Sequence, residues 1–202
     1  NENLPNNNYG VRVRDGSNIK NVVAGAPAVK GLSIISNQAM YIHGNWNSTN
    51  KIPAAFMVDS VNILSNAWSN DANSNNALTG GTRQPTATTV NAAFLSGTDT
   101  TGNVEGIGGQ NGAYNGGLEN YPRFHENWSN GPVTFTYTGS FVSLGKPRHV
   151  NGAWVYGGTQ YTAPTRAWAY DTSFNNGANL PPITPRFVYL RQELFVRQYD
   201  QS

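Results

Sequence analysis

An imperfect internal repeat limits the possible folds of this 202-residue chain more than any other feature. The segment from Ile34 to Trp46 reappears, shifted by about 22 residues, as the segment from Phe56 to Trp68. In this alignment Tyr41 lies over Ile63, and the two tryptophans coincide. A period of this length, built from two short apolar strands, is the size of one coil of a parallel β-solenoid. The repeat therefore predicts a stacked β scaffold.

The corners and a third copy of the strand pattern extend this interpretation. Asn37 and Asp59 fall at equivalent corners, and both residue types tolerate the left-handed backbone angles of tight turns. Further along the chain, Ala92-Ala93-Phe94 echoes Ala54-Ala55-Phe56. We therefore expect a mostly β fold, namely a right-handed parallel β-helix (β-solenoid) of few rungs, with one short helix and long aromatic-rich capping loops.

Composition favours strands and loops within one domain. Charged residues make up only 12% of the chain, whereas Asn alone supplies about one residue in seven. Such a turn-rich composition argues against long helices. We expect a single domain over 1–202: a polar lead-in at 1–8, rungs at 9–145 with insertions at 69–88 and 98–128, and capping loops with a terminal strand at 146–202.

Three segments carry more specific predictions. Valines alternate with arginines between Tyr9 and Asp15, which predicts a half-buried strand. Aromatic residues spaced i, i+3 and i+7 between Leu118 and Trp128 predict the short helix. The segment from Arg186 to Gln198 fits a terminal strand, and a short helix fits it nearly as well.

Charge and residue usage exclude several classes of function. The formal net charge is only +2, and the basic residues are scattered, so we expect no nucleic-acid partner. The absence of cysteine removes disulfides and thiolate catalysis. No apolar run approaches the roughly 20 residues of a membrane-spanning helix. We expect no membrane span in this fragment, and an export signal, if the protein has one, upstream of Asn1.

The residues that most often bind metals do not form a convincing site. The alternation of Asp71, Asn73 and Asn75 is how a calcium loop begins. Asn76 then stands where such a loop needs glycine, and Thr82 stands where it needs a bidentate glutamate. The histidines also lack the short spacing that would place two of them on one ion. We expect a surface loop at this segment and no metal.

The carboxylates also show no spacing that is typical of a catalytic acid–base pair. Only Asp59 lies within the repeat, and its counterpart is the neutral Asn37, as expected for a structural corner. Glu119 and Glu126 are about two helical turns apart on the expected helix, which is typical of a solvated face. We therefore expect no catalytic residue, no cofactor and no enzymatic activity.

Aromatic residues near the C-terminus are the best candidates for binding. They are Trp154, Tyr156, Tyr161, Trp168 and Tyr170, set among Gly, Pro and Thr. Exposed Trp and Tyr rings stack on sugars or anchor protein interfaces. The alternative is that these rings close the end of the solenoid or hold long loops against it.

Several motifs resemble a stretch of exported bacterial proteins that carry a PilX-like, prepilin-type N-terminus. The resemblance covers about residues 30 to 185. It is carried by motifs that include Tyr41-Ile42-His43-Gly44-Asn45-Trp46-Asn47, Val61-Asn62-Ile63-Leu64-Ser65-Asn66, Gly117-Leu118-Glu119-Asn120-Tyr121-Pro122-Arg123-Phe124, Trp154-Val155-Tyr156-Gly157-Gly158 and Pro164-Thr165-Arg166-Ala167-Trp168.

The resemblance implies an extracellular or cell-surface domain that is associated with a type IV pilus or a related secretion machinery and does structural or adhesive work. Its partners would be pilus or secretion-machinery proteins, copies of itself, or surface glycans. The hydrophobic prepilin helix of that family has no counterpart in this sequence. Two alternatives remain, which are a fibre subunit joined through its terminal strands and a β-helix protein that binds or cleaves polysaccharides.

Overall fold

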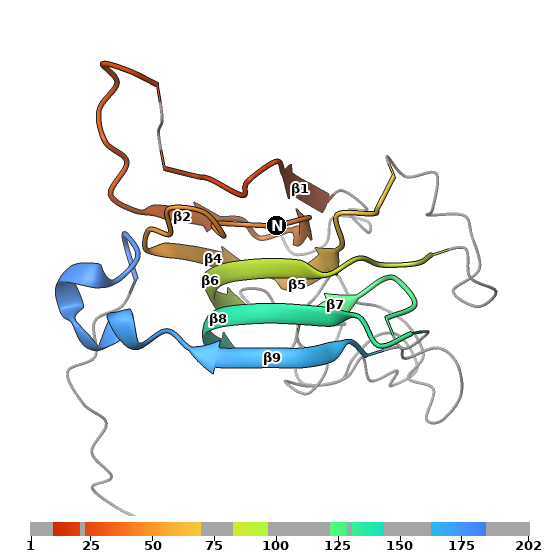
Figure 1. Cartoon of the computed structure of the whole chain (residues 1–202). Coiled ribbons are helices and arrows are strands. Elements are labelled where there is room, and N and C mark those ends of the chain that lie inside the picture. Colours follow the sequence, from red (N-terminus) through yellow and green to blue (C-terminus); the bar gives the residue numbers. More distant parts are fainter. Residues whose placement is uncertain are drawn as a thin grey trace, which may run out of the picture.

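The computed structural model describes residues 10–20, 23–69, 83–96, 122–128, 131–143 and 163–184, and it shows a mostly β fold with two parallel sheets (Figure 1). The first sheet has the order β1 (Gly10–Arg14), β3 (Ala39–His43), β5 (Ser60–Leu64), β7 (Arg123–Phe124). The second has the order β2 (Leu32–Ile35), β4 (Ala54–Val58), β6 (Thr88–Ser96), β8 (Thr134–Ser143), β9 (Thr165–Tyr170). Two 3₁₀ helices follow, η3 (Thr172–Asn175) and η4 (Gly177–Asn179).

Strands β1 to β8 alternate between the two sheets, and each strand from β3 to β8 pairs in parallel with the strand two places earlier in the chain. Figure 1 shows the second sheet as a stack that runs from β2 to β9. The prediction of a mostly β fold with stacked parallel strands is thus confirmed. We expected a single solenoid, whereas the structure establishes two separate parallel sheets.

The second sheet has the register that the repeat predicts. Ile34 pairs with Phe56, so the shift of 22 residues is correct for β2 and β4. Phe56 in turn pairs with Phe94, which confirms the third copy of the pattern. Phe94 pairs with Phe141 of β8. One row of apolar side chains therefore crosses four strands.

The first sheet has a different register, and the alignment of Tyr41 over Ile63 is wrong. Tyr41 pairs with Asn62, and Ile42 pairs with Ile63. The cause is the length of the corner between the two sheets. In the first coil residues 36–38 lie between the paired positions of the two strands, whereas in the second coil only residues 58–59 do, which is one residue fewer. A slip of one residue moves each side chain to the other face of a strand. Tyr41 consequently lies on the outer face.

The expected stacking of Trp46 on Trp68 is also wrong. Trp46 forms an isolated parallel bridge with Val90, and its backbone amide donates to Thr89. The indole of Trp46 packs against Phe56, with ring centroids 5.2 Å apart. Trp46 thus belongs to the core beneath the second sheet rather than to a ladder of tryptophans.

The core is rich in aromatic residues. Ring centroids are 6.0 Å apart for Phe56 and Phe94 and 5.4 Å apart for Phe94 and Phe141. Trp168 on β9 continues the series and lies 5.6 Å from Phe141. Tilted and edge contacts of this kind each contribute about 0.5 to 1.5 kcal/mol beyond the burial of apolar area. The ladder therefore ties the strands of the second sheet together.

The predicted helix between Leu118 and Trp128 is wrong for the part that the structure describes. Within 122–128, Arg123 and Phe124 form strand β7 on β5. Phe124 contacts Trp128 and Phe135 with its ring edge, at centroid distances of 5.5 and 5.3 Å. A strand followed by a turn thus brings Phe124 and Trp128 together without a helix, because tertiary packing overrides a short periodic pattern.

The expected boundaries of loops and insertions also change. Strand β7 lies inside the expected insertion at 98–128, and β9 lies inside the expected capping loops at 146–202. The segment from Arg186 to Gln198 lies outside the described residues. In the part of the chain that the structure describes, no helix is long and apolar enough to cross a membrane.

Candidate ligand-binding groove

The outer face of the first sheet carries a row of polar side chains from four consecutive strands. The register places Arg12 beside Tyr41, Tyr41 beside Asn62, and Asn62 beside Arg123. Their sequence neighbours, such as Ile42 and Ile63, are fully buried in the core, so this row lies on the opposite face of the sheet, where Asn62 is itself covered and only 2% exposed. Parallel strands are about 4.8 Å apart, which makes the row about 14 Å long.

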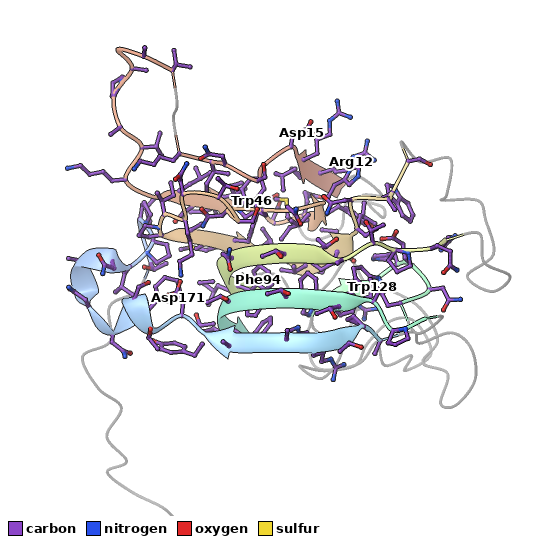
Figure 2. All side chains as sticks on the ribbon, viewed as in Figure 1. Arg12, Asp15, Trp46, Phe94, Trp128 and Asp171 are labelled. Atoms are coloured by element: carbon purple, nitrogen blue, oxygen red, sulfur yellow. The ribbon has the colours of Figure 1, made fainter. Side chains whose placement is uncertain are left out.

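A groove of about 470 Å³ lies along this face, and we refer to it as the basic groove. Its lining residues are Gly10, Arg12, Tyr41, Leu64, Trp68, Arg83 and His125. Figure 2 shows Arg12 on β1, at one edge of the molecule, with Asp15 just beyond the strand. The described lining residues include two arginines and no carboxylate.

Tyr41 is held in the groove by its neighbours. A Cβ atom on Gly10 would lie 2.8 Å from Cε2 of Tyr41, so only glycine lets the ring lie against the backbone of β1. On its other side, the Tyr41 ring lies 5.7 Å from the His125 ring, measured between centroids. The phenol is therefore fixed between β1 and the segment that follows β7.

His125 is neutral at physiological pH, and its hydrogen bonds define the tautomer. Burial, together with the charges of Arg123 and Arg83, lowers the pKa of His125 from 6.5 to about 4. Asn62 uses its Nδ2 group to donate to the carbonyl oxygen of Met40 at 3.1 Å. Its Oδ1 atom therefore faces His125 as an acceptor, and His125 Nε2 donates to it over 2.8 Å.

The positive character of the groove comes from arginines rather than from histidine. Burial lowers the pKa of His43 on β3, and the positive charge of Arg12 lowers it further. Arg83 donates from Nη1 to the carbonyl oxygen of His125 at 3.4 Å. Burial first, and nearby arginine charge second, thus disfavour protonation of both His43 and His125.

Glu126 supports the groove from inside, and its prediction as part of a solvated face is wrong. The residue is fully buried. Its carboxylate accepts hydrogen bonds from the backbone amide of Ser65 at 2.5 Å and from the Ser65 hydroxyl at 2.7 Å. Burial raises the pKa of Glu126. This carboxylate joins the end of β5 to the turn after β7, which positions the neighbouring His125.

The aromatic contact candidates have different environments. Trp168 packs against Phe135 and Tyr137, and the guanidinium carbon of Arg166 lies 5.1 Å from its ring centroid. Tyr170 is 53% exposed, and its hydroxyl donates to Asn175 Oδ1 at 3.2 Å. These two residues lie on β9, away from the basic groove. The other candidates, Trp154, Tyr156 and Tyr161, lie outside the described residues.

The candidate calcium ligands Asp71, Asn73 and Asn75 also lie outside the described residues. Among the residues that are described, no group of three or more His, Cys, Asp or Glu side chains could hold a metal ion.

The outward positions of the groove were missed in the sequence because the register of the first sheet was misaligned by one residue. Arg12 was visible as an outward residue of an alternating strand, but Tyr41 was aligned with the apolar Ile63. Burial of Ile42 would have given the correct face. The contribution of His125 depends on a strand pairing far along the chain, and no local pattern indicates it.

Comparisons of the chain with models of protein families, with curated proteins and with solved structures found no match.

Proposed function

We propose that this chain is a non-enzymatic, extracellular or cell-surface binding domain of a type IV pilus-associated or other bacterial surface protein, acting in adhesion or assembly. The observation that carries the proposal is the basic groove of about 470 Å³, which is lined by Arg12 of β1, Tyr41 of β3 and His125 of the segment after β7. Binding sites are typically concave and pre-formed, with a few polar groups that fix a ligand.

We also propose that the scaffold is a right-handed parallel β-helix of few rungs. Support comes from the alternation of β1 to β8 between the sheets, and from the rows that align Ile34, Phe56 and Phe94. A stacked scaffold of this kind presents equivalent outward positions at a fixed spacing. It suits a protein that holds a long ligand against a rigid face.

The arrangement of carboxylates favours binding over catalysis. Asp59 and Glu126 are fully buried at different places in the fold. Asp171 accepts a hydrogen bond from Lys51 at 2.8 Å, at the opposite end of the second sheet from Trp128 (Figure 2). Glycoside hydrolysis uses two carboxylates that face one bond from a short distance. None of the described lining residues of the basic groove supplies one.

The link to a pilus or a secretion machinery rests on the resemblance of the sequence to exported proteins with a prepilin-type N-terminus. Two of the motifs that carry this resemblance contribute directly to the groove or its support, since one includes Tyr41 and another includes Asn62 and Ser65. The partners would then be pilus or secretion-machinery proteins or surface glycans.

Deletion of the coding region for this domain in its native host tests the proposal. We expect fewer assembled pili, counted by electron microscopy, or weaker attachment of cells to surfaces. Complementation with the wild-type domain should restore both values. Unchanged piliation together with unchanged attachment would contradict the proposed function.

A second candidate function is a self-assembling fibre subunit. Strand β9 is the last described strand of the second sheet, and its burial pattern is mostly exposed. An exposed edge of this kind can add a strand from a neighbouring molecule. Replacement of Ala169 with proline should block such pairing, and light scattering of the purified protein should then show a monomer in place of longer assemblies.

A further inference from the structure

We propose that Asn176 is a site of spontaneous covalent modification, at which the side-chain amide is lost as ammonia and the residue becomes aspartate or isoaspartate. The site lies apart from the basic groove, and its chemistry does not depend on the proposed binding function. Three features support it, which are the residue that follows Asn176, the position of the Asn176 side chain and the exposure of this turn to water.

Asn176 is followed directly by Gly177. Among the residues that the structure describes, it is the one asparagine that precedes a glycine. Because glycine has no Cβ, its backbone amide nitrogen can approach the side-chain carbonyl of the preceding residue without steric hindrance. Asn179, three residues further along, precedes Leu180, whose side chain hinders the same approach.

The Asn176 side chain already folds toward the backbone that follows it. Asn176 lies between η3 and η4, and its Oδ1 atom accepts a hydrogen bond from the amide of Ala178 at 3.0 Å. Such a side-chain turn places Cγ of Asn176 next to the amide nitrogen of Gly177. The same hydrogen bond polarises the side-chain carbonyl and stabilises negative charge that develops on its oxygen. The attacked carbon is therefore both close and activated.

This turn is open to water. Asn176, Gly177 and Ala178 are all exposed, and a Cβ atom added to Gly177 would have no neighbour within 4 Å. Asn47 offers a contrast, because it also precedes a small residue, Ser48. Its side chain is fully buried and hydrogen-bonded to the backbone of two other segments. We therefore expect the reaction at Asn176 and not at Asn47.

Water is the only co-reactant that the reaction needs. The amide nitrogen of Gly177, after loss of its proton, attacks Cγ of Asn176. A new N–C bond forms, the bond from Cγ to Nδ2 breaks, and ammonia leaves. Water then opens the resulting cyclic imide on one side to give aspartate or on the other side to give isoaspartate. Either product adds one negative charge, which lowers the formal net charge of the chain from +2 to +1.

The two products have different effects on the turn. Aspartate keeps an acceptor for the amide of Ala178, and it caps a helical turn as well as asparagine does. Isoaspartate lengthens the backbone by a methylene group and loses this cap. Further along the same segment, the hydroxyl of Ser33 on β2 donates to the carbonyl oxygen of Pro182. Isoaspartate at position 176 should therefore loosen the connection between the end of β9 and β2.

Incubation of the purified protein in mildly alkaline buffer, followed by brief tryptic digestion and mass spectrometry, tests the inference. Cleavage after Arg166 and Arg186 gives one peptide that contains both Asn176 and Asn179. We expect the change from amide to acid at Asn176 to be at least about tenfold faster than at Asn179, since only Asn176 precedes glycine. The rate should rise with pH, because the attacking amide must first lose its proton.

Gly177→Ala is the matched variant. The open space around Gly177 accepts the added Cβ, so the fold should be kept, and modification of Asn176 should slow by about tenfold. Equal rates at Asn176 and Asn179, an unchanged rate in Gly177→Ala, or modification that occurs only after unfolding in urea would each overturn the inference.

Thermal unfolding tests the effect of the two products. Asn176→Asp should unfold at the same temperature as the wild type, whereas incubated samples should unfold at a lower temperature in proportion to their isoaspartate content. An unchanged unfolding temperature in samples rich in isoaspartate would contradict the loosening of the link to β2.

Discussion

Asn47 and Asn91, which are 44 residues apart in the sequence, form two reciprocal hydrogen bonds, each from the side-chain amide of one residue to the backbone carbonyl of the other. Asn47 Nδ2 donates to the carbonyl oxygen of Asn91 at 3.0 Å, and Asn91 Nδ2 donates to the carbonyl oxygen of Asn47 at 2.9 Å. The Asn47 side chain also bonds both the amide and the carbonyl of Ile52. Asn45 and Asn66 form a similar exposed link nearby. Abundant asparagine thus fastens turns in neighbouring coils.

Because of the hydrogen bonds of Asn47, we predict that replacing asparagine with glycine lowers the stability of the protein much more at Asn47 than at Asn50. Asn47 and Asn50 both have φ near 51°, but only Asn47 is fully buried and fastened to Ile52 and Asn91. Glycine accepts this backbone conformation, so Asn47→Gly removes only the side-chain bonds. We expect it to lower the free energy of unfolding by about 2 to 4 kcal/mol, since buried backbone groups lose their partners.

Asn50→Gly serves as the control, with an expected change within about 0.5 kcal/mol because the residue is exposed. Urea denaturation of both variants measures the difference. Similar losses in the two variants would show that backbone conformation, and not the Asn47 hydrogen bonds, is what matters at these turns.

His125 predicts a loss of stability in mild acid. Its pKa is lowered to about 4 in the folded protein, so the unfolded chain takes up a proton first as the pH falls below 6.5. The contribution is complete above about pH 6.5 and is lost at up to about 1.4 kcal/mol per pH unit down to pH 4. The stability difference between wild type and His125→Gln, measured by denaturation at several pH values, should shrink over this window. A constant difference would contradict the prediction.

Lys51 and Asp171 form an ion pair between distant parts of the chain, and we predict that this pair stabilises the fold. Their charged atoms are 2.8 Å apart, and the Asp171 side chain is only 8% exposed. Burial alone would raise the pKa of Asp171, but hydrogen bonds from Lys51 and Ser173 outweigh it and lower the pKa. Lys51→Met leaves this carboxylate with fewer partners and should cost about 1 to 3 kcal/mol at neutral pH.

Because the pKa of Asp171 is lowered in the folded state, the stabilisation is present above the ordinary pKa and is lost as the pH falls through the lowered value. Thermal denaturation should therefore show a smaller effect of Lys51→Met at strongly acidic pH. Lys30→Met, at an exposed position, is the control. An effect of Lys51→Met that is equally large in strong acid would exclude the ion pair as its cause.

The structure leaves no space for a side chain at Gly139 in β8. A Cβ atom there would collide with the carbonyl oxygen of Ala92 and with the hydroxyl of Tyr137. That hydroxyl already donates to Ala92 at 2.7 Å, so neither group can move without loss. Gly139→Ala should destabilise the protein by about 2 kcal/mol or more.

The matched control is Gly177→Ala in η4, where the added Cβ would have no neighbour within 4 Å. This substitution should be neutral or slightly stabilising, since alanine restricts the unfolded chain. Thermal unfolding of the two variants compares them directly. Tolerance of alanine at Gly139 would mean that β6 and β8 can separate locally.

The parts of the fold that sequence predicted are those in which neighbouring coils repeat the same residue type. Phe56 and Phe94 align because an inward aromatic side chain is kept at one position of successive strands. The register of the first sheet escaped prediction because the length of a corner is independent of the strands that it joins. Strand β7 escaped it because Phe124 and Trp128 fit a helical spacing equally well.

The basic groove could be predicted only in part. The outward position of Arg12 followed from alternation with Val11 and Val13. The place of His125 beside Tyr41 depends on β7 joining β5 after a separation of about 60 residues, which no local pattern encodes. Glu126 is buried but was likewise predicted to be on the surface. Its partner Ser65 is far away in the sequence, and no local pattern marks this serine as the partner of a carboxylate.

The corner at 36–38 has one residue more than its counterpart at 58–59, yet both sheets keep unbroken ladders on either side of it. Chain length can therefore vary at this point without altering strand pairing. Asn37 is exposed at the middle of this corner. A foreign peptide inserted beside it would project from the molecule while the stack stayed intact, so the domain could serve as a rigid carrier for displayed epitopes.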